Sequence, residues 1–320
     1  MVVSAEQIKK IGVIGAGTMG HGIAQAYAQE GYPVTITDIA KSALTGVKDR
    51  IKSNLDTLVR EGLIPEKESG NIIGRITVVD SLENAVRDAD LVTEAIFEDL
   101  PTKTDIFREM EKFCSPECLM ASNTSSFPMT QISSQMEKPD RAIVTHWVNP
   151  PYLVPLVEVV PGEKTSEETY KTAHDILVKI KKVPVKVQKE ILGFLINRIQ
   201  EAMNREVYHL LEIGAASAED IDRAVVTSLG FRLAFLGPLL VRDLAGLDVT
   251  CKVDEVLYEE LNSSTQVNKM LKGMVDRGEY GAKTGKGFFS YTPESLAEII
   301  KERDRRFIHL LKELYYEPQS

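Results

Sequence analysis

One histidine and one glutamate in the stretch THWVNPPYLVPLVEVV have side chains that suit acid–base chemistry. His146 stands near the end of the apolar run RAIVTHW (141–147), and Glu158 lies inside the apolar run LVEVV (156–160). Imidazole accepts and returns protons near neutral pH. A buried carboxylate can orient an imidazole ring and stabilise its charged form. Spacing alone leaves open a second interpretation, a capping histidine beside a hydrogen-bonded core glutamate.

A glycine pattern near the N-terminus indicates a phosphate-binding turn. The stretch IGVIGAGTMGHGIAQ has the form Gly-x-Gly-x-x-Gly after an apolar run and at the start of a helical pattern. In such a motif the glycines allow a tight turn, close approach of a pyrophosphate, and packing of helix on strand. The next predicted strand ends in Asp38, which can accept hydrogen bonds from ribose hydroxyls and would repel a 2′-phosphate. The residues predicted to contact the dinucleotide here are Gly15, Gly17, Thr18, Met19, Gly20 and Asp38.

This motif favours NAD over NADP. FAD shares the fingerprint, and a glycine turn with a purely structural role is the other interpretation. A nicotinamide becomes the better choice because oxidation of an alcohol needs a base such as His146 while hydride leaves for the ring.

The first half of the chain alternates short apolar runs with amphipathic helical patterns, which predicts an α/β fold with a doubly wound, Rossmann-type parallel sheet. His146 then falls at the carboxyl edge of a strand, where ligands bind in such sheets. A long insertion at about 40–74 has helical apolar spacing and is predicted to form a helical hairpin. The predicted strands cover residues 9–15, 32–38, 75–80, 89–96, 118–123 and 141–147, followed by the apolar runs at 156–160 and 182–188.

Helical periodicity replaces the strands from Gly193 onward. We therefore predict an NAD-binding domain at 1–190 and an all-helical domain for substrate binding and dimerisation at 191–320. The second domain is expected to end in a long charged helix that begins at Thr292 and Pro293.

Bulk composition excludes several classes of function. The net charge is 38 − 47 = −9, which disfavours binding to nucleic acid or to an anionic membrane. Three cysteines, Cys114, Cys118 and Cys251, are too few for a disulfide framework and fit a reducing cytoplasm. Their spacing, without a nearby histidine, predicts no metal site. No signal peptide and no apolar run of ~18 residues is visible, so we expect a cytoplasmic protein.

Several separated motifs together resemble the 3-hydroxyacyl-CoA dehydrogenase superfamily. The resemblance extends from the glycine turn to YGAKTGKGFFSY (280–291) and includes SNTSS (122–126) and GFLINR (193–198). It implies that His146 and Glu158 form the catalytic pair. It also implies that Ser125 and Asn197 hydrogen-bond the substrate oxygen, and that further cofactor contacts are made by Glu98, Lys103, Asn123 and Asn149.

The form NPPY resembles one branch of this superfamily, that of lambda-crystallin (L-gulonate 3-dehydrogenase), and relatives that act on carnitine and on a pyridine carboxylate. In the CoA enzymes, lysines of the hairpin meet the CoA phosphates. The aligned positions here are Thr57 and Glu61, and a carboxylate repels a phosphate unless Arg60 or Lys52 compensates. Arg232 has a counterpart in the free-acid relatives, where its guanidinium would pair with a substrate carboxylate. A surface arginine in a loop is the other interpretation.

We therefore expect an NAD-dependent dehydrogenase that oxidises a small free 3-hydroxy acid and forms a homodimer through its helical domain. A short-chain 3-hydroxyacyl-CoA dehydrogenase, acting on 3-hydroxybutyryl-CoA, is the first alternative. A binding protein of the crystallin type, without catalysis, is the second, and the presence of both members of the histidine–glutamate pair argues against it.

Overall fold

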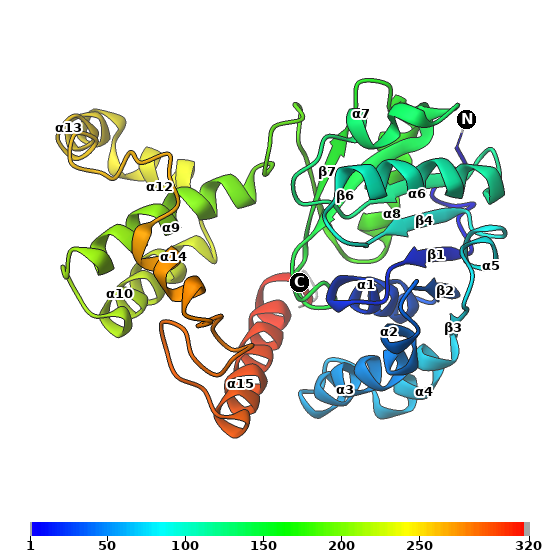
Figure 1. Cartoon of the computed structure of the whole chain (residues 1–320), viewed down its shortest axis with the longest axis horizontal. Coiled ribbons are helices and arrows are strands. Elements are labelled where there is room, and N and C mark those ends of the chain that lie inside the picture. Colours follow the sequence, from blue (N-terminus) through cyan, green and yellow to red (C-terminus); the bar gives the residue numbers. More distant parts are fainter. Residues whose placement is uncertain (1, 317–320) are drawn as a thin grey trace. The chain divides into compact units, whose positions relative to one another are not determined.

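The computed structural model describes residues 2–316, which fall into two compact units. The first unit contains residues 2–197 and 300–316, and the second contains residues 198–299. Figure 1 labels most of the helices and strands along the chain.

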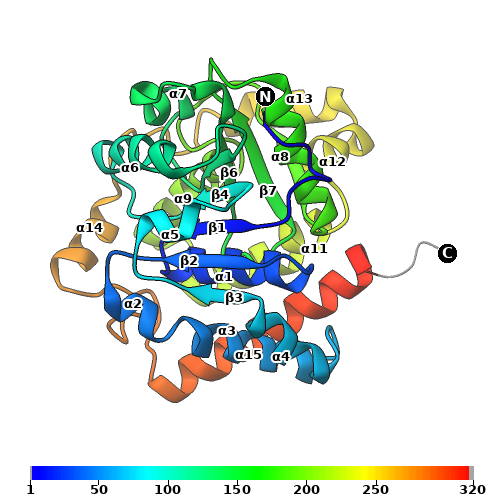
Figure 2. The same ribbon diagram turned by 90° about the vertical axis from the view of Figure 1, so that its right-hand side faces the viewer.

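An eight-stranded sheet forms the centre of the first unit, in the order β3-β2-β1-β4-β5-β6-β7-β8. All neighbouring strands are parallel except β6 and β7, which are antiparallel. Figure 2 shows β3, β2, β1 and β4 following one another across the sheet. The predicted Rossmann-type fold is confirmed. The strands are β1 (Ile11–Ile14), β2 (Val34–Thr37), β3 (Ile76–Val78), β4 (Leu91–Glu94), β5 (Leu119–Ser122), β6 (Ala142–Trp147), β7 (Leu156–Pro161) and β8 (Val183–Lys186).

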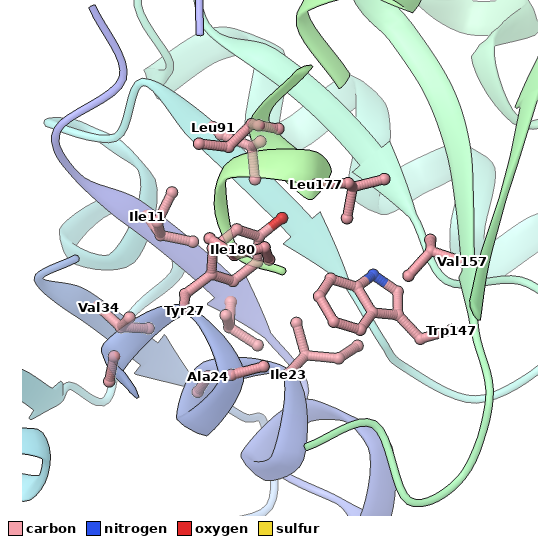
Figure 3. Packing of buried hydrophobic residues seen from close by; sticks show 14 of the residues in the cluster. Ile11, Ile23, Ala24, Tyr27, Val34, Leu91, Trp147, Val157, Leu177 and Ile180 are labelled. Carbon is pink, nitrogen blue, oxygen red and sulfur yellow. The ribbon is translucent and has the colours of Figure 1, made fainter. Parts of the chain in front are cut away.

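Successive strand residues alternate between two apolar clusters, because side chains of a strand point to opposite faces. Leu91 of β4 belongs to one cluster and Val92 to the other. The first cluster is drawn in Figure 3, where Tyr27 and Trp147 pack edge to face with ring centroids 5.7 Å apart. The helical elements of this unit are α1 (Thr18–Gln29), α2 (Lys41–Thr45), α3 (Val47–Arg60), α4 (Glu66–Gly74), α5 (Leu82–Val86), α6 (Leu100–Phe113), α7 (Met129–Ile132), η1 (Ser133–Gln135), η2 (Pro139–Arg141) and α8 (Glu167–Lys179).

The helical hairpin predicted at about 40–74 is present as α2, α3 and α4. Helix α3 turns Leu55 and Leu58 into the first apolar cluster. Ile308 and Leu311, near the end of the chain, are buried in the same cluster. Residues 300–316 therefore belong to the first unit. This differs from the sequence-based division, which placed the whole C-terminal helix with the helical domain.

The second unit is helical throughout and has few buried side chains. Ser217 accepts a hydrogen bond from the backbone N–H of Asp220 (3.1 Å) and so caps the start of α10. Within residues 198–299 the only buried hydrophobic residues are Ile221 and Met274. The remaining elements are α9 (Ile196–Glu212), which starts in the first unit, α10 (Ala218–Ala224), η3 (Val225–Gly230), α11 (Phe231–Leu233), α12 (Pro238–Ala245), α13 (Leu247–Leu257), α14 (Lys269–Asp276), α15 (Pro293–Leu311) and η4 (Lys312–Tyr316).

Across residues 2–316, no single helix has the length and apolar composition needed to cross a membrane. One bent pair, Ala218–Leu233 with Pro238–Ala245, meets both criteria only when its two arms are taken together, and the arms meet at 87°.

Candidate active site

A cavity of about 610 Å³ lies at the carboxyl ends of β1, β2 and β4. It collects residues that are far apart in the sequence and that were predicted from separate motifs. Those that line it are Gly15, Gly17, Thr18, Met19, Asp38, Glu98, Asn123 and Ser125.

The three glycines of the turn are required for different reasons. Gly15 has φ +103°, and a Cβ there would lie 2.4 Å from the carbonyl oxygen of Ala95. A Cβ on Gly20 would lie 1.8 Å from the carbonyl oxygen of Gly15, so helix and strand could not pack as closely. A Cβ on Gly17 would meet no atom within 4 Å. Gly17 is therefore not needed for packing, and its missing side chain leaves room in the cavity for a ligand.

Asp38 holds a fixed position at the end of β2. Its two carboxylate oxygens accept hydrogen bonds from the backbone N–H groups of Ala16 (2.7 Å) and Ala40 (2.8 Å). The carboxylate thus joins the glycine turn to the loop after β2 and keeps a negative charge beside the cavity. This arrangement suits ribose hydroxyls and opposes a 2′-phosphate.

Two exposed apolar side chains on the cavity wall were not predicted. Ile39 is 98% exposed and Phe97 is 86% exposed, although both are large and hydrophobic. Each is adjacent in sequence to an acidic residue that was predicted, Asp38 and Glu98 respectively. Apolar side chains of this size at a cavity mouth are available to cover the faces of a bound ring.

Glu98 organises the SNTSS turn. One of its oxygens accepts hydrogen bonds from the Thr124 hydroxyl (2.6 Å) and from the backbone N–H groups of Ser125 and Ser126 (both 2.9 Å). The position of Ser125 at the cavity is therefore set by Glu98. A glutamate in this role both lines the cavity and holds the turn that presents the serine.

Lys103 lies behind the cavity wall and not in it. It is 1% exposed, and its Nζ lies 2.7 Å from Oε1 of Glu94 and 3.3 Å from Oε2 of Glu98. Glu94 also accepts a hydrogen bond from the Ser122 hydroxyl (2.6 Å). In this structure Lys103 thus acts on the cavity through Glu98, whereas the sequence predicted a direct cofactor contact. Glu94, the first residue of the motif EAIFE, was missed.

The predicted catalytic pair is brought together by the antiparallel pairing of β6 and β7, in which His146 and Glu158 are directly opposite. The carboxylate can only accept, so the Nδ1–H of His146 donates to Oε2 of Glu158 (2.7 Å). Both side chains are buried. Within residues 2–316 no group hydrogen-bonds Nε2 of His146, which leaves that nitrogen available to a substrate.

The other oxygen of Glu158 explains why a carboxylate occurs in an apolar strand. Oε1 accepts hydrogen bonds from the backbone N–H groups of Leu195 (2.8 Å) and Ile196 (3.0 Å) at the start of α9. These are donors that a helix cannot satisfy internally, and the helix dipole favours a negative charge there. Burial acts to raise the pKa of Glu158, but the hydrogen bonds from His146, Ile196 and Leu195 outweigh it and hold that pKa below its ordinary value.

Phe194 also positions the histidine and was not predicted. It is fully buried, and its ring centroid lies 5.6 Å from that of His146, tilted by 54°. Its φ of +47° lies in the left-handed region, which costs a non-glycine residue about 1–2 kcal/mol. The motif GFLINR thus places an aromatic side chain against the imidazole just before α9 begins.

Comparison with known proteins identifies the family. The description "3-hydroxyacyl-CoA dehydrogenase, NAD binding domain" matches residues 10–191, and "3-hydroxyacyl-CoA dehydrogenase, C-terminal domain" matches residues 193–291. The chain belongs to the 3-hydroxyacyl-CoA dehydrogenase family. It is accordingly an NAD-dependent dehydrogenase that acts on CH–OH groups, and its cofactor is NAD.

Relatives in this family differ in the substrates that their names state. A 5-formyl-3-hydroxy-2-methylpyridine 4-carboxylate 5-dehydrogenase of Mesorhizobium japonicum is 34% identical, covering 94% of this chain and 96% of its own. An L-carnitine dehydrogenase of Streptomyces coelicolor is 33% identical, with coverages of 97% and 96%. A 3-hydroxybutyryl-CoA dehydrogenase of Clostridioides difficile is 35% identical, with coverages of 88% and 99%.

The fold is shared with solved members of the family. A crystal structure of the pyridine-carboxylate 5-dehydrogenase has a TM-score of 0.89 at 32% identity and covers 96% of this chain and 99% of its own. Each of these proteins is one that this chain resembles, and their substrates differ, so family membership leaves the substrate open.

The remaining predicted residues of this dehydrogenase are placed as follows. Asn197 lies in the first turn of α9, directly after the N–H groups that bind Glu158, and is half-buried. Asn149 is exposed, three residues beyond His146. Arg232 lies in α11 of the second unit and is exposed, and its Nε donates to the carbonyl of Ser228 (3.4 Å).

Replacing Glu158 with glutamine should make the free energy of unfolding less dependent on pH in the acid range. The folded-state pKa of Glu158 is below its ordinary value of 4.5, so the carboxylate stabilises the fold above pH 4.5, and this contribution is lost as pH falls through the lowered pKa. At pH 7, Glu158→Gln should be less stable than wild type by about 1–3 kcal/mol, and the difference should shrink in acid. Thermal unfolding across this range measures it, with the exposed Glu163→Gln as control. An equal difference at all pH values would contradict the assignment.

Proposed function

We propose that this dehydrogenase oxidises the secondary alcohol of a small free 3-hydroxy acid to the 3-oxo acid. The observation that carries the proposal is the pair formed by His146 and Glu158, in which Glu158 is anchored by the N–H groups that open α9. This anchoring holds the imidazole in one tautomer, with Nδ1 bearing hydrogen and Nε2 able to accept a proton.

The reaction divides into a proton transfer and a hydride transfer. Nε2 of His146 takes the proton of the substrate hydroxyl, and Glu158 stabilises the imidazolium that results. The C3–H bond breaks as the carbonyl forms, and its hydrogen leaves with both electrons; bound NAD supplies the acceptor for this hydride. Ser125 and Asn197 are proposed to hydrogen-bond the reacting oxygen.

The C-terminal segment supports a free acid over a CoA ester. This segment lies beyond residue 291, where the match to the family description ends. It includes the end of α15, whose Ile308 and Leu311 belong to the same apolar cluster as Leu55 of the hairpin. The Lys312 ammonium donates to the carbonyl of Glu61, and Nε2 of His309 lies 3.8 Å from the Glu61 carboxylate. The hairpin end at Glu61 is therefore occupied by the chain itself.

Arg232 is the proposed partner of the substrate carboxylate. Among the described residues its guanidinium makes only the long hydrogen bond to Ser228, so its terminal nitrogens are available for bidentate pairing.

Arg232→Met should raise KM for a free acid by about 10- to 100-fold, corresponding to a charged hydrogen bond of about 1.5–3 kcal/mol. Arg242→Met, another exposed arginine of the second unit, is the control. Equal KM values for the two variants would remove Arg232 from the site.

A short-chain 3-hydroxyacyl-CoA dehydrogenase is the second candidate. The relative from Clostridioides difficile, which is named a 3-hydroxybutyryl-CoA dehydrogenase, favours it. Its identity of 35% exceeds the 34% and 33% of the relatives named for the pyridine carboxylate and for carnitine. This candidate predicts competitive inhibition by CoA esters and sensitivity of KM to changes at Arg60.

One assay separates the candidates. NADH formation, followed by its absorbance, is measured with a panel of free 3-hydroxy acids and with their CoA esters. Our proposal expects the highest kcat/KM with a free acid. A higher value with a CoA ester favours the second candidate, and tight NADH binding without turnover on any compound would indicate a binding protein.

We also propose that the chain forms a homodimer through the second unit. That unit leaves large apolar side chains open, with Leu239 82% exposed, Phe231 70% and Leu244 70%. Apolar surface of this extent in a unit with almost no buried core indicates that it is covered in the assembled protein.

Light scattering should give twice the chain mass of 35.6 kDa. Leu239→Glu should shift the mass towards that of one chain, and a monomeric wild type would refute the proposal.

A further inference from the structure

The loop of residues 148–155 joins the strand that carries His146 to the strand that carries Glu158. We call it the connecting loop. Its shape sets the direction in which the chain leaves β6 and enters β7, and so affects the placement of the catalytic pair. The loop is held from three elements that are distant in the sequence.

Lys182 holds the loop from one side. It follows α8 and is 8% exposed, and its Nζ donates to the backbone carbonyls of Pro151 (2.7 Å) and Val154 (2.9 Å). The same Nζ lies 5.5 Å above the ring of Trp147, the residue after His146. Within residues 2–316 no carboxylate pairs with this ammonium. A lysine that is buried without an ion pair therefore has two loop carbonyls as its hydrogen-bond partners.

The surroundings of Lys182 indicate that its placement is costly. Burial lowers the pKa of Lys182 to about 7, against the opposing effect of the Glu30 carboxylate. Glu30 itself is paired with the exposed Lys181 (3.0 Å). A neutral amine has two N–H groups, which match the two loop carbonyls. Lys181 also has φ +59°, an unfavourable backbone conformation for a lysine, at the turn that directs Lys182 inward.

The other side of the loop is held by the C-terminal helix. Burial raises the pKa of the Tyr152 hydroxyl, which therefore stays protonated and donates to the buried Asp304 of α15 (3.4 Å). Pro151 packs against α1, where a Cβ on Gly22 would lie 2.6 Å from its ring. Helix α1 is the helix that begins at the glycine turn. The connecting loop is thus tied both to the cofactor helix and to the C-terminal segment.

We propose that Lys182 and Asp304 are positioning residues of the dehydrogenase, which hold the connecting loop so that His146 and Glu158 keep their catalytic alignment. This inference rests on the proposed role of that pair. Because misplacement of a reacting group by about 1 Å costs on the order of 10²-fold in rate, loosening the loop should lower kcat more than it weakens binding.

The test compares Lys182→Met with Lys181→Met in the full-length protein. Methionine fills the space of the lysine but leaves the carbonyls of Pro151 and Val154 without a donor. We expect Lys182→Met to lower kcat at least tenfold while KM and the Kd for NADH change less than threefold. Hydrogen exchange at the Leu153 and Val154 amides should quicken about tenfold, whereas Lys181→Met should match wild type in each measurement.

Two further variants keep the result decisive if Lys182→Met does not fold. Tyr152→Phe removes the donor and Asp304→Leu removes the acceptor of the bond to α15 with little change of shape, and each should lower kcat about three- to tenfold with faster exchange in the loop. A folded Lys182→Met with wild-type kcat and wild-type exchange overturns the inference, as does the same result for Tyr152→Phe and Asp304→Leu. A wild type without turnover on any acid or ester would instead overturn the proposed function, and exchange would still report on the loop.

Discussion

Replacing His146 with alanine should lower kcat by about 10²- to 10⁴-fold, the usual contribution of a positioned acid–base group. The substrate hydroxyl then has no base, while Ser125, Asn197 and the cofactor cavity are unchanged. The Kd for NADH should therefore stay within a factor of about two. Steady-state NADH formation at saturating substrate measures the first quantity, and quenching of intrinsic fluorescence by NADH measures the second.

The chain offers a matched control for this variant. His174 also lies beside a carboxylate, with Nδ1 3.0 Å from Oδ1 of Asp175, but this pair is only partly buried on α8. His174→Ala removes the same side chain from a second histidine–carboxylate pair and should leave kcat unchanged. Turnover by His146→Ala equal to that of wild type at saturating substrate would refute the role of His146.

Replacing Gly17 with valine should weaken NADH binding at least about 100-fold, or ~2.7 kcal/mol, without unfolding the protein. A Cβ at this position would meet no protein atom within 4 Å, so we expect the fold to accept a small side chain there. The open space is part of the cavity at the glycine turn, where the pyrophosphate of NAD must approach the backbone. Titration with NADH and thermal unfolding without cofactor measure the two effects.

Two other glycines provide control variants for Gly17→Val. Gly70, in α4, also has open space around its Cα and lies outside the cavity, so Gly70→Ala should bind NADH like wild type. At Gly20 a Cβ would collide with the carbonyl of Gly15, so Gly20→Ala should lower the melting temperature of the cofactor-free protein. Normal NADH affinity in Gly17→Val would show that the dinucleotide lies elsewhere.

The sequence predicts those features that depend on residues close together in the chain. The strands, the hairpin and the glycine turn follow from apolar periodicity and from the steric needs of a phosphate-binding turn. The pair of His146 and Glu158 was also accessible, because a histidine at a strand end and a glutamate in an apolar strand are both unusual. The spacing left two interpretations, and the register of β6 and β7 places the two side chains opposite each other.

Contacts between distant segments could not be read from the sequence. Three features depend on tertiary neighbours: the burial of Ile308 in the first apolar cluster, the burial of Lys103 behind Glu98, and the hydrogen bonds from Lys182 to the connecting loop. Lys103 stands between two threonines and Lys182 between a lysine and a valine, and neither pattern predicts that the lysine side chain is buried. Only the fold shows that each is buried against acceptors that lie in other elements.

Deuterium transfer tests the central claim most directly. The free acid with the highest turnover in the panel is prepared with deuterium at C3 and incubated with NAD and either wild type or His146→Ala. The account predicts that wild type yields the 3-oxo acid and NADH carrying the deuterium on its nicotinamide ring, while His146→Ala forms both at least about 10²-fold more slowly. NADH without deuterium, or transfer only from the CoA ester, would contradict it.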